Sequence, residues 1–173
     1  SGKMPEPEIL FQYIERELAG PKDLTGKKVL VTAGPTQENI DPVRYITNHS
    51  SGKMGYAVAK AAMLRGAEVT LVSGQTALTP PMFVDYVQIT TAEEMYQAVT
   101  SRSDEQDIII KAAAVADYRP KTVYENKVKK QDGQMSIELE RTRDILAYLG
   151  EHKRENQFLC GFSMETENMI GNS

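Results

Sequence analysis

The sequence predicts an α/β fold in which a parallel sheet is flanked by helices. Apolar segments at residues 27–33, 68–73 and 107–115 have the length and composition of buried strands. A helical pattern at residues 52–65 separates the first two, and this order forms a parallel pair joined by a right-handed crossover. After Pro120 apolar and polar residues alternate, as in an antiparallel hairpin. We therefore expect a Rossmann-like parallel sheet with a β-hairpin flap.

Length and composition indicate one ordinary globular domain. A chain of 173 residues with 40% hydrophobic residues can fold around its own core. The net charge of -4 argues against nucleic acid as the main partner. The chain shows no run of about 18 apolar residues and no opening signal peptide, so we expect a cytoplasmic protein with no membrane partner. Its one cysteine, Cys160, is interpreted as a small buried hydrophobic residue.

Residues 1–26 precede the first strand and contain one short amphipathic helix. Leu10, Ile14 and Leu18 recur at four-residue spacing, and Gly20-Pro21 ends the pattern. Two interpretations stay open. The helix either packs on the domain that follows or forms a linker from a preceding domain.

An unusually long loop lies between the first strand and the helix at residues 52–65. Connections of this kind usually take about 2–6 residues, so the segment from Gly34 to Ser51 is interpreted as a binding loop. Its polar residues are too many for a simple turn: Thr36, Gln37, Glu38, Asp41, Arg44, Asn48, Ser50, Ser51 and Lys53. Ser50, Ser51 and Gly52 precede the helix, where free amide groups and the helix dipole favour an anion. We expect the active site here.

The later strands bring small and polar residues to the same edge of the sheet. A short strand at residues 84–89 is followed by a helix that Thr91 is expected to cap. The strand at residues 107–115 ends in alanines, among them Ala113 and Ala114, which leave room for a ligand near the backbone. Core packing explains these alanines about as well. Asp117 then adds a carboxylate at this edge.

The predicted flap consists of residues 126–130 and 135–140. Lys127 and Lys129 fall on one face of an extended segment, which predicts a hairpin with a basic face. A solvated charged hairpin without a function is an equally good interpretation. Asp144 begins a further helix, and residues 158–163 form a buried strand.

Two common classes of site are disfavoured by what the sequence lacks. His49 and His152 are isolated, so a metal site built by the protein is not expected. The glycine fingerprint G-x-G-x-x-G is absent, which counts against hydride transfer with a nicotinamide, and a complete P-loop is absent as well.

Four motifs, in this order, resemble those of phosphopantothenoylcysteine synthetase, the second enzymatic half of the bacterial bifunctional coenzyme A biosynthesis protein. They are TAGPT with IDPVRYITNHSSGKMG at residues 32–55, AAVADYR at 113–119, KVKK at 127–130, and GF with ET at 161–166. The lead-in GKMPEP at residues 2–7 resembles the junction after a flavin-dependent decarboxylase half. Residues 27–173 are therefore expected to form the synthetase domain, with its C-terminal part missing.

The resemblance implies a two-step ligase. The carboxylate of 4'-phosphopantothenate would attack the α-phosphate of CTP with Mg2+ and release pyrophosphate. The amine of cysteine would then displace CMP to give 4'-phosphopantothenoylcysteine. It also implies a homodimer, and it places FMN only in a preceding decarboxylase domain that this chain lacks.

The resemblance also assigns roles to individual residues. Lys127 would stabilise charge at the α-phosphate, Asn48 would serve the acyl-cytidylate, and Arg44 would bind the substrate phosphate, either within its own subunit or across a dimer interface. Substrate binding would involve Arg44, Asn48, Ala113 and Ala114. Nucleotide binding would involve Gly34, Ser50, Ser51, Gly52, Asp117, Lys127, Lys129, Lys130 and Phe162.

This sequence departs from the family pattern at two places. Thr142-Arg143 stands where the family more often has Asn-Pro, and Ser163-Met164 where it often has two alanines. Two other classes stay open as alternatives: a non-catalytic nucleotide-binding or assembly module, and a Rossmann-type oxidoreductase.

Overall fold

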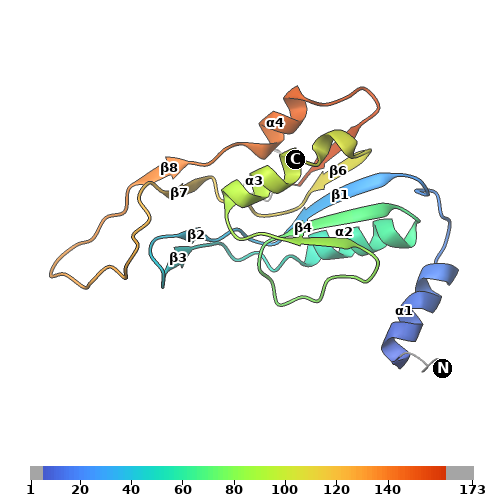
Figure 1. The fold of residues 1–173 in the computed structure, drawn as a ribbon, viewed down its shortest axis with the longest axis horizontal. Coiled ribbons are helices and arrows are strands. Elements are labelled where there is room, and N and C mark those ends of the chain that lie inside the picture. The colour runs from blue at the N-terminus through green and yellow to red at the C-terminus, as the bar shows by residue number, and fades with distance from the viewer. Residues whose placement is uncertain (1–5, 163–173) are drawn as a thin grey trace, which may run out of the picture.

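The computed structural model describes residues 6–162, and its centre is a parallel sheet of five strands in the order β5-β4-β1-β6-β9 (Figure 1). The strands are β1 (Lys28–Ala33), β4 (Glu68–Ser73), β5 (Asp85–Gln88), β6 (Ile108–Lys111) and β9 (Phe158–Gly161). From β1 the chain first builds outward through β4 and β5, and then crosses to β6 and β9. The strand order therefore reverses between β1 and β6, and ligands of such sheets bind at the carboxyl ends of the strands beside this point.

One face of the sheet packs on α2 (Lys53–Leu64). Alternate residues of β1 and β4 point to this face, and the helix adds Tyr56, Ala59, Ala62 and Met63 to the same cluster. Gly55 allows the close approach, since a Cβ at this position would lie 2.4 Å from the Cβ of Ala33. The βαβ unit that the sequence pattern predicts is thus confirmed.

The opposite face packs on α3 (Ala92–Thr100) and α4 (Ile145–Glu151), which lie together above the sheet in Figure 1. Leu30 of β1 and Ile109 of β6 are at the centre of this second cluster, together with Met95 of α3. A short 3-10 helix, Ser103–Glu105, connects α3 to β6. The sheet is therefore covered on both faces, as the apolar character of its strands predicts.

Helix caps agree with the sequence at three positions. The Thr91 hydroxyl oxygen accepts a hydrogen bond from the Glu94 amide at 3.1 Å, which caps α3. Asp144 accepts from the Ala147 amide at 3.0 Å and caps α4. Gly66 follows α2 with a φ of 94°, a conformation that favours glycine at a helix end.

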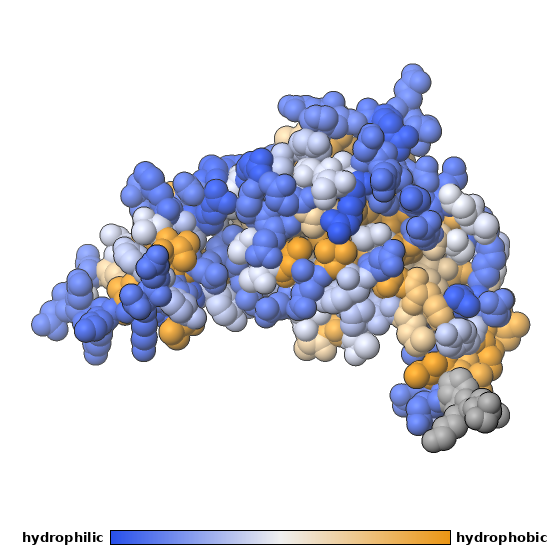
Figure 2. Space-filling model, viewed as in Figure 1, coloured by the Kyte–Doolittle hydropathy of each residue, from blue (hydrophilic) through white to orange (hydrophobic). Residues whose placement is uncertain are grey.

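The helix α1 (Pro7–Leu18) lies beside α2 and away from the carboxyl edge of the sheet (Figure 1). Its contacts include the ion pair of Glu15 with Lys60 at 3.4 Å and the edge-to-face pair of Tyr13 with Phe83 at 4.8 Å. None of its residues is buried. Apolar residues of α1 form an orange area at the lower right of Figure 2.

The segment predicted to form the flap belongs to an arm, defined here as residues 118–141, whose strands differ from those expected. β7 (Tyr118–Pro120) pairs with β8 (Leu139–Arg141) at the base of the arm. Residues 121–138 contain no strand, so the predicted pairing of residues 126–130 with 135–140 is wrong. The backbone of this part instead bonds to the loop after β1, for example from the Tyr124 amide to the Ile40 carbonyl at 3.0 Å.

The last described strand corrects two further expectations. β9 lies at the edge of the sheet, and Phe158 is 62% exposed, so this strand is not buried. Cys160 is half-buried. An apolar sequence does not distinguish an edge strand from a central one. The expected strand residue Ser163 and the motif residues Glu165 and Thr166 lie outside the described residues.

Candidate functional site

The loop after β1 enters the candidate site through a backbone turn that needs glycine. Gly34 has a φ of 77°, and a Cβ on it would lie 2.9 Å from the Thr76 side chain. A Cβ on Gly74, which follows β4, would lie 1.8 Å from the Pro35 carbonyl oxygen. The chain after β1 therefore crosses directly over the end of β4, and any larger residue at either position would displace it.

The N-terminus of α2 packs against the same turn. Gly52 is the N-cap residue, has a φ of 80° and is buried, and a Cβ on it would lie 3.4 Å from the Gly34 backbone. Its side chain cannot cap the helix, while the Ser51 hydroxyl oxygen accepts from the Lys53 amide at 3.4 Å. Gly34, Ser51 and Gly52 are thus brought together, and the helix terminus can favour an anion here.

Asn48 connects this loop to the chain that follows β6. Its side-chain amide donates to the Ala114 carbonyl at 2.9 Å, and its amide oxygen accepts from the Ser50 amide at 3.0 Å. Ala114 also forms an isolated parallel bridge with Pro35. Asn48, Ser50 and Ala114 therefore meet at the point where the strand order reverses.

Thr36 forms a second connection across the same point. Its hydroxyl oxygen accepts from the Ala116 amide at 3.0 Å, and its carbonyl accepts from the Thr47 hydroxyl at 2.8 Å. Ala113, in the same segment after β6, donates its amide to the Thr32 hydroxyl oxygen of β1 at 3.2 Å. These bonds explain why β6 ends at Lys111, although a strand was predicted to residue 115: the backbone beyond it bonds to the loop.

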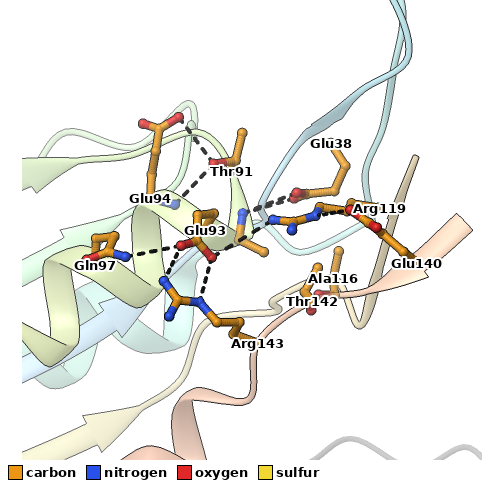
Figure 3. Close-up of polar contacts among 11 residues, drawn as sticks. Glu38, Thr91, Glu93, Glu94, Gln97, Ala116, Arg119, Glu140, Thr142 and Arg143 are labelled. Carbon is orange, nitrogen blue, oxygen red and sulfur yellow. Dashed lines mark hydrogen bonds and ion pairs between the residues drawn. The ribbon is translucent and has the colours of Figure 1, made fainter. Parts of the chain in front are cut away.

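A buried carboxylate holds the loop after β1 against the start of α3 (Figure 3). Glu38, in the two-residue strand β2 (Glu38–Asn39), is 2% exposed and accepts from the Ala92 amide at 3.1 Å, at the start of α3. β2 pairs with β3 (Tyr45–Ile46). Burial raises the pKa of Glu38, although bonds from Thr36 and Ala92 oppose the shift.

Asp41 is the second buried carboxylate of the loop and is 2% exposed. It accepts hydrogen bonds from the amides of Val43, Arg44 and Val128, at 2.9, 2.8 and 3.1 Å. The guanidinium of Arg44 adds two more, from Nε at 3.1 Å and from Nη2 at 2.6 Å. Arg44 and these amides hold the pKa of Asp41 well below its usual range, with the arginine as the largest cause.

The arm carries the predicted lysines around a cavity of about 1130 Å³. Lys127, Lys129 and Lys130 line it and are exposed, and Arg44 lines it from the loop after β1. The structure thus forms two groups of predicted site residues. One group lies at the sheet edge. The other lies between the loop after β1 and the arm, and Asp41 and Arg44 connect the loop to the arm there.

Two predicted nucleotide contacts lie at the margins of the site. Asp117 is exposed, and its carbonyl accepts from the Thr142 amide at 2.9 Å, just before β7. Phe162 directly follows β9, is 51% exposed, and donates its amide to the Lys111 carbonyl at 3.1 Å. Both residues stand at the carboxyl edge, and the exposed ring of Phe162 is available to a ligand.

A charged network that the sequence did not predict lies beside α3, as Figure 3 shows. Glu93 pairs with Arg143, and the Arg143 guanidinium lies 4.0 Å from the centre of the Tyr96 ring. Arg119 of β7 reaches Glu93 at 3.9 Å and Glu140 of β8 at 3.0 Å. Arg143 holds the pKa of Glu93 below its usual range. The signal available in the sequence was Arg143 itself, which stands where the family more often has proline.

Residues 6–162 lack two other features. Those residues contain no group of three or more His, Cys, Asp or Glu side chains placed to hold a metal ion. None of the helices described there combines the length and the apolar character needed to cross a bilayer.

Fold and site together define a Rossmann-like α/β domain with a long polar loop over its topological switch point. Residues 24–173 match the family described as the DNA/pantothenate metabolism flavoprotein C-terminal domain, and the chain belongs to this family. It is 50% identical over 171 residues to the coenzyme A biosynthesis bifunctional protein CoaBC of Bacillus subtilis (strain 168). That alignment covers 97% of this chain and 42% of the relative, so the chain spans less than half of the longer protein.

Solved structures support the same fold. The chain resembles the crystal structure of the C-terminal domain of a CoaBC protein, with a TM-score of 0.75 and 54% identity over 85% of this chain and 69% of that one. A mutant of Cab2 in complex with phosphopantothenate-cysteine has a TM-score of 0.73. At 18% identity over 98% of this chain and 74% of that one, the second match shows likeness of fold alone.

Proposed function

We propose that this chain is the phosphopantothenate–cysteine ligase part of a coenzyme A biosynthesis protein. It would use CTP to activate 4'-phosphopantothenate and would then couple cysteine to the activated carboxyl group. The observation that carries the proposal is the meeting of Asn48, Ala114 and the N-terminus of α2 at the switch point of the sheet. The 50% identity to a protein named for coenzyme A biosynthesis supports it.

In the first step a carboxylate oxygen of phosphopantothenate would form a bond to the α-phosphorus of CTP, and pyrophosphate would leave. Negative charge then accumulates on the phosphates. The free amide groups at the start of α2 and the lysines of the arm can stabilise it. Mg2+ fits as an ion carried by the triphosphate, since residues 6–162 offer no cluster of ligands for it, and it would supply further charge neutralisation.

In the second step the amine nitrogen of cysteine would form a bond to the acyl carbon and lose a proton to solvent, and CMP would leave with the bonding electron pair. Asn48 suits this step because an amide can donate to an acyl oxygen and does not act as a nucleophile. Its nitrogen already donates to the Ala114 carbonyl, and the bond to Ser50 fixes the orientation of the amide. Asn48 is therefore positioned before any ligand binds.

The test follows both steps by mass spectrometry in wild type and Asn48→Asp. Each is incubated with CTP, phosphopantothenate and Mg2+, with and without cysteine. We expect wild type to form the amide product and CMP, and Asn48→Asp to release pyrophosphate and accumulate the acyl-cytidylate. Asn39→Asp is the matched control, because it adds the same charge at an exposed position of the same loop, and it should retain turnover.

Three outcomes would contradict the proposal. Binding of CTP without intermediate or product in wild type would indicate a non-catalytic nucleotide-binding module. Failure of the wild-type protein to bind CTP would refute the assignment of a nucleotide site to this chain. Equal loss of both steps in Asn48→Asp would assign Asn48 to the structure of the loop and not to the second step.

A further inference from the structure

Asp41 stands out because it is a buried carboxylate that no step of the proposed reaction uses. It lies at the turn between β2 and β3, and its side chain has no exposed surface. Five donors from two distant parts of the chain converge on it. A buried charge is tolerated when its hydrogen-bonding capacity is used in this way.

The bonds of Asp41 connect the loop after β1 to the lysine-bearing part of the arm. Oδ2 accepts from the Val128 amide, and Val128 stands between Lys127 and Lys129. Nη2 of Arg44 donates to both Asp41 Oδ2 and the Val128 carbonyl, the latter at 3.0 Å. Both backbone polar groups of Val128 are therefore held by the same ion pair.

The ion pair also determines how Arg44 can act. Nε and Nη2 of its guanidinium are engaged by Asp41, while Nη1 takes part in none of these bonds. The Arg44 side chain is 40% exposed and lines the arm cavity with the lysines. An anion in this cavity would meet a guanidinium of fixed orientation, which lowers the entropic cost of binding.

We propose that Asp41 is a positioning residue: it holds Arg44 and the Lys127–Lys130 segment in one geometry for a phosphate-bearing substrate. The effect of Asp41 on the reaction rests on the proposed ligase function. Its structural role, which is to hold Arg44 and Val128 in place, does not rest on that function. Asp41 touches no substrate in this proposal and acts through Arg44 and Val128.

The experiment compares Asp41→Asn with wild type by amide hydrogen exchange and by steady-state kinetics. Asparagine keeps the size of the side chain but loses the charge and one acceptor oxygen. We expect the Val128 amide to exchange at least about tenfold faster, while amides of β1 and β4 keep their rates. We also expect kcat/KM to fall by up to about 100-fold, with KM for phosphopantothenate raised.

Two further variants separate positioning from general destabilisation. Asp23→Asn breaks another aspartate–arginine pair, a solvent-exposed one in which Arg65 Nε donates to Asp23 at 2.7 Å next to α2, and it should leave both readouts unchanged. Arg44→Lys keeps the positive charge but loses the paired contacts with Asp41, so it should accelerate exchange at Val128 as Asp41→Asn does.

Exchange at Val128 that is unchanged in Asp41→Asn, or that rises equally in β1 and β4, would overturn the positioning role. Faster exchange with unaltered kinetics would overturn its consequence for the reaction. Absence of turnover in wild type would instead refute the proposed ligase, and Val128 exchange would still decide whether Asp41 holds the arm.

Discussion

Single residues hold the candidate loop in place mainly through buried polar groups. Glu38 and Asp41 are both 2% exposed, yet their surroundings shift their acidities in opposite directions. Glu38 is buried beside the start of α3 and is stabilised in its protonated form. Asp41 has an arginine and several amides around it and is stabilised as the carboxylate. Two acidic residues three positions apart thus have different physical roles.

The raised pKa of Glu38 predicts a pH-dependent cost to stability. The folded state binds the Glu38 proton more tightly than the unfolded state does, so this group lowers the free energy of unfolding as pH rises from about 4.3 to the raised pKa. Glu38→Gln does not titrate and can still accept from the Ala92 amide. We expect its stability relative to wild type to increase across this pH window, as measured by urea unfolding.

A difference between Glu38→Gln and wild type that stays constant with pH would contradict this prediction. A difference that decreases as pH rises would reverse its sign, and would mean that the bonds from Thr36 and Ala92 outweigh burial. The comparison isolates Glu38 because the other carboxylates titrate equally in both proteins.

Helices and strands of this chain differ in how much they contribute to the stability of the whole fold, and α1 contributes little. The helix α1 contains no buried residue, and its contacts with the rest of the molecule are few: the ion pair of Glu15 with Lys60, the packing of Tyr13 and Arg16 on Phe83, and a bond from Lys22 to the Arg16 carbonyl. Deletion of residues 1–18 should therefore lower the free energy of unfolding by only about 1–2 kcal/mol, measured by denaturant unfolding. Tyr13→Ala, which removes the ring that contacts Phe83 and Arg16, should account for part of this loss. A loss as large as that of a core substitution would contradict the prediction.

Helices and strands could be predicted from the sequence where the spacing of their own apolar residues and nearby capping residues determine them. The βαβ unit of β1, α2 and β4 repeats apolar residues at the spacing of each element, and Thr91 and Asp144 cap helices through residues close in sequence. The arm could not be predicted in detail, because the backbone of Val128 is held by Asp41, far away in sequence. The exposure of Phe158 depends on its place at the sheet edge, which an apolar segment does not reveal.

The place of the candidate loop in the fold could be predicted from the sequence, but the contacts that hold it could not, and ligand binding by its residues stays a prediction. The length and polarity of the loop after β1 indicated a binding loop, and its residues do lie at the carboxyl edge. The ion pair of Arg44 with Asp41 and the network of Glu93, Arg119 and Arg143 depend on side chains from separate elements. Spacing along the chain does not specify such pairs.

At the scale of the whole molecule, the two core clusters share one sheet. Leu30 is 0% exposed and lies at the centre of the cluster that joins β1, β4 and β6 to α3 and α4. We expect Leu30→Ala to lower the free energy of unfolding by about 2–5 kcal/mol while the denaturant m-value is unchanged. Circular dichroism during urea unfolding measures both quantities.

Leu146→Ala is the matched control for Leu30→Ala. Leu146 of α4 is 47% exposed, so the same truncation should cost less than about 1 kcal/mol there. A similar loss at both positions would contradict the assignment of Leu30 to the centre of the core. A changed m-value would indicate that the domain does not unfold as one cooperative unit.

The contacts that form the candidate site also have a consequence for the order of folding. Asn48 bonds to Ala114 across 66 residues, Ala116 to Thr36 across 80, and Val128 to Asp41 across 87. The entropic cost of closing such long loops must be met before these bonds contribute, whereas β1, α2 and β4 all lie within residues 28–73 and need shorter closures. We therefore expect the scaffold around β1 to assemble first and the ligand-binding surface to mature last. A newly made chain would accordingly acquire its fold before it acquires the capacity to bind.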